Sequence, residues 1–248
     1  MRFFCAILAA CTVTLPVASQ AQTKYSAVVA EELRYRDYVV DLSRIQGHVD
    51  LETARATMRK QIDIAESVST RPEIKQFWRT VRVELASDLA MGDGGHARGA
   101  YNVHDRVVKM TALIGSNGSS PVLIHELAHA VHYQLLPQGA KNAKIIELYE
   151  AAKQSGRYPT DSYALRNERE FWAVMSTIYL NGSDGYPPFT RARLKEQEPE
   201  LYALMSRIYG DQPGEKPIVA ARATLACYDV KSAGLDPRLS WVNSFACR

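Results

Sequence analysis

Residues 120–137 read SPVLIHELAHAVHYQLLP, and this stretch decides the fold that we expect. Its apolar residues recur at helical spacing, with Ser120 suited to the N-cap and Pro121 to the first helical position. The helix should end near Pro137. Within it lies the pattern His-Glu-x-x-His, formed by His125, Glu126 and His129. Such a pattern is informative only in a helix, where residues four apart share one face.

The His-Glu-x-x-His pattern predicts a site for Zn²⁺. Residues four apart lie about 6 Å apart along a helix axis. The imidazoles of His125 and His129 can therefore reach one zinc ion at about 2.0–2.1 Å each. Glu126 lies beside the first ligand, where it can take a proton from a metal-activated water and return it to a leaving amine. The alternative is a pair of surface histidines with an incidental glutamate, which the helical context disfavours.

His132 is the nearest further imidazole, but helix geometry excludes it as a third ligand. It is about 10.5 Å from His125 along the axis, whereas two donors to one zinc ion lie within about 4 Å of each other. We expect His132 either to support the site from behind the ligands or to be exposed as polar surface. His96 and His104 lack a helical partner, so we expect them at the rim of the site or on the surface.

A second helix should supply the third ligand, and residues 162–173 read SYALRNEREFWA. Tyr163 stands seven residues before Glu170, with Asn167-Glu168 between them and Phe171-Trp172-Ala173 after them. Together with the His-Glu-x-x-His helix, this arrangement resembles the catalytic domain of anthrax lethal factor and its relatives, over roughly residues 95 to 209. The resemblance implies a zincin fold, Glu170 as the third zinc ligand, and Tyr163 facing the metal-activated water.

The chemistry of these residues agrees with the resemblance. Two histidines and one glutamate form a recognised catalytic zinc set, and Tyr163 can hydrogen-bond a developing oxyanion. Glu170 can also be an ordinary first-turn carboxylate favoured by the helix dipole, and Tyr163 is one of 13 tyrosines. Glu168 would point to another face of the helix. Val174 departs from the family, which tends to place there a second carboxylate that braces a histidine ligand.

The pattern around the motif helix predicts an α+β, zincin-like fold, with a small twisted sheet over that helix and a mostly helical C-terminal half. Further helices are predicted from Asp50 to Val68, from Pro72, and over residues 144–153, 167–180 and 199–209. Strands are predicted at 81–85, 100–103 and 107–110, and Tyr38-Val39-Val40 can form another. The run 100–110 can be an edge strand that pairs with extended substrate, or a plain hairpin.

The two ends of the chain indicate export. The apolar run 3–15, which follows Arg2 and precedes small residues, is typical of a signal peptide cleaved near Ala21. It is shorter than the roughly 20 residues of a membrane span. Leu8-Ala9-Ala10-Cys11 leaves lipoprotein processing as a lesser alternative. Cleavage would leave Cys227 and Cys247, which we expect to form a disulfide in a secreted or periplasmic protein.

Length and charge bound the remaining choices. The chain has 248 residues and a formal net charge of +3 with no basic block, so neither nucleic acid nor stable membrane insertion is indicated. We expect four segments: a signal peptide (1–21), an N-terminal helical segment packed on the catalytic domain (22–80), the catalytic domain (81–210) and a disulfide-closed tail (211–248).

The predicted function is a secreted zinc metalloendopeptidase that acts on a protein or peptide. Two other functions remain open: a non-catalytic binding protein on a zincin scaffold, and a zinc amide hydrolase with a non-peptide substrate. The intact Glu126 disfavours the first of these, because a scaffold has no need of a general base.

Overall fold

The computed structural model describes residues 31–90, 96–112 and 120–214. The signal peptide with its cleavage near Ala21, and the predicted pair Cys227–Cys247, lie outside these residues. Within the described ranges, none of the helices combines the length and the apolar character that crossing a bilayer requires.

The described part of the chain is α+β, with all five strands in its first half and most of the helices in its second. The first half contains β1 (Glu32–Tyr35), β2 (Tyr38–Asp41), the 3₁₀ turn η1 (Ser43–Ile45), α1 (Leu51–Ser67), α2 (Pro72–Thr80), β3 (Arg82–Ala86), β4 (Gly99–Asn102) and β5 (Val107–Thr111). The second half contains α3 (Val122–Gln134), η2 (Gly139–Lys141), α4 (Ala143–Gln154), η3 (Tyr163–Leu165), α5 (Glu168–Asn181), α6 (Arg191–Gln197) and α7 (Pro199–Tyr209).

The strands form one mixed sheet in the order β1-β2-β3-β5-β4. The central strands β2, β3 and β5 are parallel, whereas β1 and β4 run antiparallel to their neighbours. The register pairs Val40 with Val83 and Leu85 with Met110, and all four side chains are fully buried. Residues two apart on a strand share a face, so these apolar positions build the face that meets the helices. At the other end of the order, β4 is an edge strand.

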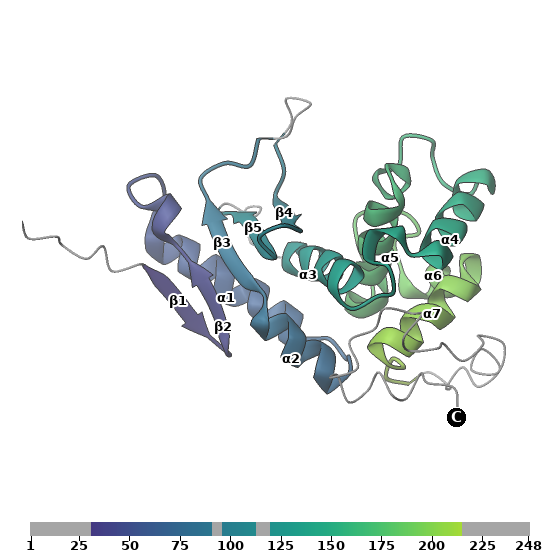
Figure 1. Cartoon of the computed structure of the whole chain (residues 1–248), viewed down its shortest axis with the longest axis horizontal. Coiled ribbons are helices and arrows are strands. Elements are labelled where there is room, and N and C mark those ends of the chain that lie inside the picture. Colours follow the sequence, from purple (N-terminus) through teal and green to yellow (C-terminus); the bar gives the residue numbers. More distant parts are fainter. Residues whose placement is uncertain (1–30, 91–95, 113–119, 215–248) are drawn as a thin grey trace, which may run out of the picture.

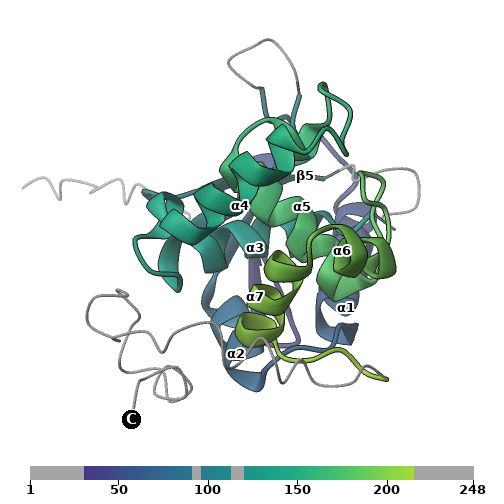
Figure 2. The same ribbon diagram turned by 90° about the vertical axis from the view of Figure 1, so that its right-hand side faces the viewer.

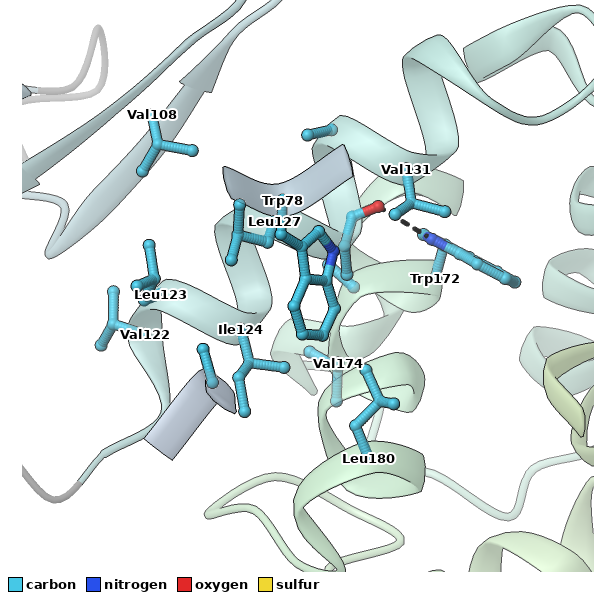
Figure 3. Packing of buried hydrophobic residues seen from close by; sticks show 14 of the residues in the cluster. Trp78, Val108, Val122, Leu123, Ile124, Leu127, Val131, Trp172, Val174 and Leu180 are labelled. Carbon is cyan, nitrogen blue, oxygen red and sulfur yellow. Dashed lines mark hydrogen bonds between the residues drawn. The ribbon is translucent and has the colours of Figure 1, made fainter. Parts of the chain in front are cut away.

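Helix α3 is the centre of the molecule (Figure 1). It contacts β4 and β5 on one side and α5 on the other, and it also contacts α1. Ten of the 13 residues of α3 are buried, among them the polar Glu126, His129 and His132. Figure 2 looks onto the helical half, where α4 to α7 lie in front of α3. In Figure 3, Trp172 of α5 is directed at α3, and its Nε1 donates to the carbonyl oxygen of Ala128 at 3.1 Å.

The N-terminal segment differs from the helical segment that we expected before residue 81. Its described part contributes β1 and β2 as well as two helices, and the sheet therefore crosses the expected boundary. The strand at Tyr38-Val39-Val40 is confirmed as β2, whereas β1 was not predicted. Short, charged β1 has little strand signal of its own and is defined by its pairing with β2. Arg71 also ties this segment to the end of α7, because its backbone N–H donates to the Tyr209 carbonyl at 2.8 Å.

The other predicted helices and strands are confirmed with shifts of a few residues, and α6 is an addition. The start of α3 corrects one prediction: Pro121, and not Ser120, is the N-cap, and no side chain of its own caps the helix. Gln61 of α1 takes that role from a distance. Its Oε1 accepts from the Leu123 N–H at 3.1 Å, and its Nε2 donates to the Ser120 carbonyl at 2.8 Å.

Candidate metal centre

Three side chains from α3 and α5 converge at one point. His125 and His129 approach with their Nε2 atoms, and one oxygen of Glu170 lies 3.1 Å from the first and 3.5 Å from the second. The three donor atoms all lie within 4.8 Å of one another, and this group could hold a metal ion. The structure therefore brings together the three residues predicted as ligands.

The geometry of this group fits a small divalent cation. Two donors at about 2.0–2.2 Å from a tetrahedral ion lie about 3.3–3.6 Å from each other. The distances from the Glu170 oxygen to the two Nε2 atoms, 3.1 and 3.5 Å, lie just below and within this range. Little movement of the side chains would therefore be needed to admit an ion. The ring planes of His125 and His129 are nearly perpendicular, at 83°. This orientation allows the Nε2 lone pairs of both rings to point at one ion. The donor set of two imidazoles and one carboxylate is one that zinc accepts.

Local structure at the start of α5 fixes the position of Glu170. Asn167 is the N-cap, and its side chain accepts hydrogen bonds from the backbone N–H groups of Arg169 and Glu170. Glu170 thus stands in the first turn, where the helix dipole favours a negative charge. The neighbouring Glu168 is outside the metal-binding group and lies 3.7 Å from the Arg169 side chain, as expected for a residue on another face.

The close contact between the Glu170 carboxylate and the two imidazoles shifts the pKa values of the group. Burial alone would raise the pKa of Glu170, but hydrogen bonds with His125 and His129 outweigh it and hold that pKa well below the usual range. Burial alone would lower the pKa of His125, but the hydrogen bond with Glu170 and the nearby carboxylate charges raise it. The carboxylate is therefore ionised at neutral pH and is prepared to bind a cation.

Glu126 is buried beside the group, with only 4% of its surface exposed. Burial raises the pKa of its carboxyl above the ordinary value, while the two imidazoles and the Tyr101 backbone N–H act in the opposite direction. Its Oε2 has no hydrogen-bond partner among the described protein groups. A Cβ atom at Gly99 would lie 2.6 Å from Glu126 Oε1, so glycine at this position of β4 leaves room for the acid.

Tyr163 lies in η3, just before α5. Its ring centroid is 6.1 Å from that of His125, and its hydroxyl hydrogen-bonds the Glu170 carboxylate. Burial, followed by the charge and the hydrogen bond of Glu170, raises the pKa of Tyr163 above its ordinary value. The phenol therefore stays protonated at neutral pH and can act as a hydrogen-bond donor.

A cavity of about 280 Å³ lies between these groups. It is lined by His96, Ala97, Arg98, Gly99, Ser120, Pro121, Val122, His125, Glu126, Tyr163, Asp184 and Tyr186. The lining residues come from the segment that leads into β4, from the start of α3 with the two residues before it, and from η3 and the loop after α5. Of the predicted site residues, His125, Glu126 and Tyr163 line this cavity directly.

The remaining sequence predictions have mixed outcomes. His96 is an exposed residue at the cavity rim and His104 is exposed in the turn before β5, as predicted. His132 is outside the metal-binding group, as predicted, but the suggestion of polar surface is wrong because its side chain is completely buried. It packs against the rings of Tyr133 and Trp172, since α5 covers this face of α3. Val174 is fully buried in the apolar core and offers no brace for a ligand (Figure 3).

Three site residues were missed by sequence reasoning. Gln61 lies in α1 and reaches the start of α3 only through tertiary packing. Gly99 carried a weak signal as one of several loop glycines, and Asp184 carried none, because it follows α5 in an irregular loop.

No family model matches the chain, and no curated protein or solved structure matches it either.

Proposed function

We propose that this chain is a zinc-dependent metallopeptidase with a zincin fold of the lethal-factor type. The observation that carries the proposal is the convergence of His125, His129 and Glu170, beside a cavity that is lined by His125 and by the buried carboxylate of Glu126. A metal site that only stabilised the fold would be closed by a fourth protein ligand. Here only three donors converge within the described residues, and the cavity beside them is large enough for part of a substrate.

The chemistry of the bound ion would be that of a Lewis acid, which polarises a carbonyl and makes water more acidic. The residues of the chain supply the proton transfers. Glu126 accepts the proton of the attacking water at its carboxylate and passes it to the leaving nitrogen. Tyr163 donates a hydrogen bond from its hydroxyl to the carbonyl oxygen as negative charge develops there.

A peptide is the substrate class that the surroundings favour. β4 is an edge strand, and the residues that lead into it line the cavity. An extended peptide can add to such an edge by backbone hydrogen bonds, which places its carbonyl groups along the cavity. The alternative of a non-peptide amide has no corresponding feature among the described residues.

The experiment compares wild-type protein with Glu126→Gln after zinc reconstitution. We expect both to bind one zinc ion per chain, and we expect cleavage of a peptide library by the variant to fall by about 10²–10⁴-fold. Glu150→Gln is the matched control, since it neutralises an exposed carboxylate on α4 and should leave cleavage unchanged. The proposal fails if wild-type protein binds zinc and cleaves no peptide, or if Glu126→Gln cleaves as fast as wild type.

A further inference from the structure

Asp184 is a carboxylate in the cavity that the proposed chemistry does not use. It lies in the loop between α5 and α6 and lines the same cavity as Glu126 and Tyr163. Its charge and that of His125 act on each other's pKa, so the carboxylate is near the metal-binding group without joining it.

The backbone around Asp184 is held in place by both neighbouring helices. The Asp184 N–H donates to the Phe189 carbonyl at 3.0 Å, and Ser183 forms a bridge with Thr190. The Arg191 side chain at the start of α6 donates to the Tyr179 and Leu180 carbonyls at the end of α5. Asp184 is thus presented to the cavity by a fixed loop.

No cationic side chain among the described residues forms an ion pair with Asp184. Its hydrogen-bond donor is the backbone N–H of Gly185. Burial raises the pKa of the Asp184 carboxyl, and neither this N–H nor His125 fully offsets that effect. Partly buried carboxylates usually have a charged or multiply hydrogen-bonded partner, and the described part of the chain supplies Asp184 with this single N–H donor.

The neighbouring aromatic rings suit a cation. Tyr163 and Tyr186 line the cavity together with Asp184, and their rings stack with centroids 5.0 Å apart at 25°. Tyrosine faces attract ammonium and guanidinium groups through their ring quadrupole. Arg98, a cationic residue that also lines the cavity, is exposed and belongs to the segment that leads into β4. The part of the cavity formed by η3 and the 183–190 loop therefore combines a carboxylate with two aromatic rings.

We infer that Asp184, with the Tyr163–Tyr186 pair, forms a specificity pocket for a cationic group of the substrate next to the scissile bond. The group is an ammonium or guanidinium, from a Lys or Arg side chain or from a free amino terminus. This inference rests on the proposed peptidase function. Asp184 is a specificity residue in this scheme, and it takes no part in the proton transfers.

The test uses quenched-fluorescence peptides that are identical except at one position close to the cleavage site. Lys is compared with norleucine at each flanking position, and a free amino terminus is compared with an acetylated one. Wild-type protein should prefer the cationic member of one pair by about tenfold or more in kcat/KM. Asp184→Asn should abolish this preference, Asp184→Glu should retain part of it, and Asp184→Lys should favour Glu at the same position. Glu150→Gln serves as the control that retains the wild-type ratio.

A binding measurement separates failure of the pocket from failure of the peptidase proposal. The Lys and norleucine peptides are titrated calorimetrically into Glu126→Gln protein and into the double variant with Asp184→Asn. Tighter binding of the Lys peptide that disappears in the double variant supports the pocket even if no peptide is cleaved. The pocket is refuted if Asp184→Asn cleaves peptides with the same preference for Lys as wild-type protein. It is equally refuted if the double variant binds the Lys peptide with the same preference as Glu126→Gln. It is also refuted if Asp184→Asn only lowers zinc content, because the residue would then position the metal site.

Discussion

The helices α3 and α5 carry the three candidate ligands, but they begin in different ways. α5 has its own cap, because Asn167 accepts from the backbone N–H groups of the first turn. α3 has no side-chain cap of its own and depends on Gln61, which is 62 residues away from the Leu123 N–H that it accepts. The position of Glu170 is thus determined locally, whereas the positions of His125 and His129 depend on how α1 packs against α3.

The largest expected effect comes from removing the contribution of α5 to the metal centre. Glu170→Ala removes the only carboxylate oxygen among the described residues that lies within the donor group. We expect zinc affinity to fall by more than about 100-fold, since even residues that only orient ligands affect metal affinity by about 10–100-fold. A competitive titration with a fluorescent zinc chelator measures this change.

Glu168→Ala is the matched control for this variant, because it removes a carboxylate two residues away that lies outside the donor group. Equal loss of affinity in the two variants would mean that the first turn of α5 acts through its overall charge and not through a ligand.

A change on β4 tests the α3 side of the cavity without touching a ligand. In Gly99→Ala, the new methyl group would lie 2.6 Å from the present position of Glu126 Oε1 and must displace that carboxylate. We expect peptide cleavage to fall by about tenfold to 100-fold, because a displaced base transfers protons poorly. Zinc affinity should change little, whereas the free energy of unfolding should fall by about 1–3 kcal/mol because the buried site is overpacked. Unchanged cleavage in this variant would contradict the role of Glu126 as the base.

The caps of α3 and α5 should contribute different amounts to the free energy of unfolding. Gln61→Leu leaves the Leu123 N–H without a partner and removes one of the two donors to the Ser120 carbonyl, so we expect a loss of about 1–3 kcal/mol in the free energy of unfolding. Asn167→Ala should cost about 1 kcal/mol. Urea unfolding of the metal-free proteins measures both values. Equal losses, or a larger loss for Asn167→Ala, would contradict the greater dependence of α3 on a distant partner.

The smallest expected effect concerns His132, on the face of α3 that meets α5. Burial, with smaller contributions from His129 and Arg169, lowers the pKa of His132 to about 3. In the unfolded chain the pKa is about 6.5, so between these values the unfolded state binds more protons. The contribution of neutral His132 to the free energy of unfolding is therefore present in full above pH 6.5 and is lost as the pH falls. The loss amounts to about 1 kcal/mol at pH 5.5.

His132→Leu should lack this part of the pH dependence, which thermal unfolding of metal-free protein at pH 7.5 and 5.5 measures. The difference between wild type and variant isolates His132 from the other titrating groups. The same loss of stability in both proteins would show that His132 is not the group responsible.

Local patterns in the sequence were sufficient to predict most helices and strands. Periodic apolar residues define α1 and α3, and the cap at Asn167 marks the start of α5. The approach of His125 to His129 follows from helix geometry alone. Glu170 was predicted as the third ligand from the resemblance of residues 162–173 to the lethal-factor catalytic domain. The structure brings the three residues together.

The features that could not be predicted depend on contacts between distant segments. β1 is a strand because it pairs with β2, and Gln61 caps α3 because α1 packs beside it. His132 is a polar residue in a helix that looked amphipathic, but α5 covers the face on which it lies. Asp184 reaches the cavity because the loop after α5 folds back toward α3. None of these relations leaves a pattern along the chain.

The most direct test of the metal centre is an anomalous-difference map from crystals grown with zinc. We predict one strong peak per chain, about 2.0–2.2 Å from His125 Nε2, His129 Nε2 and a carboxylate oxygen of Glu170. Glu126 should lie beside this peak without binding the ion. A peak elsewhere, or a Glu170 that keeps its hydrogen bond to His125 with no ion between them, would contradict the account.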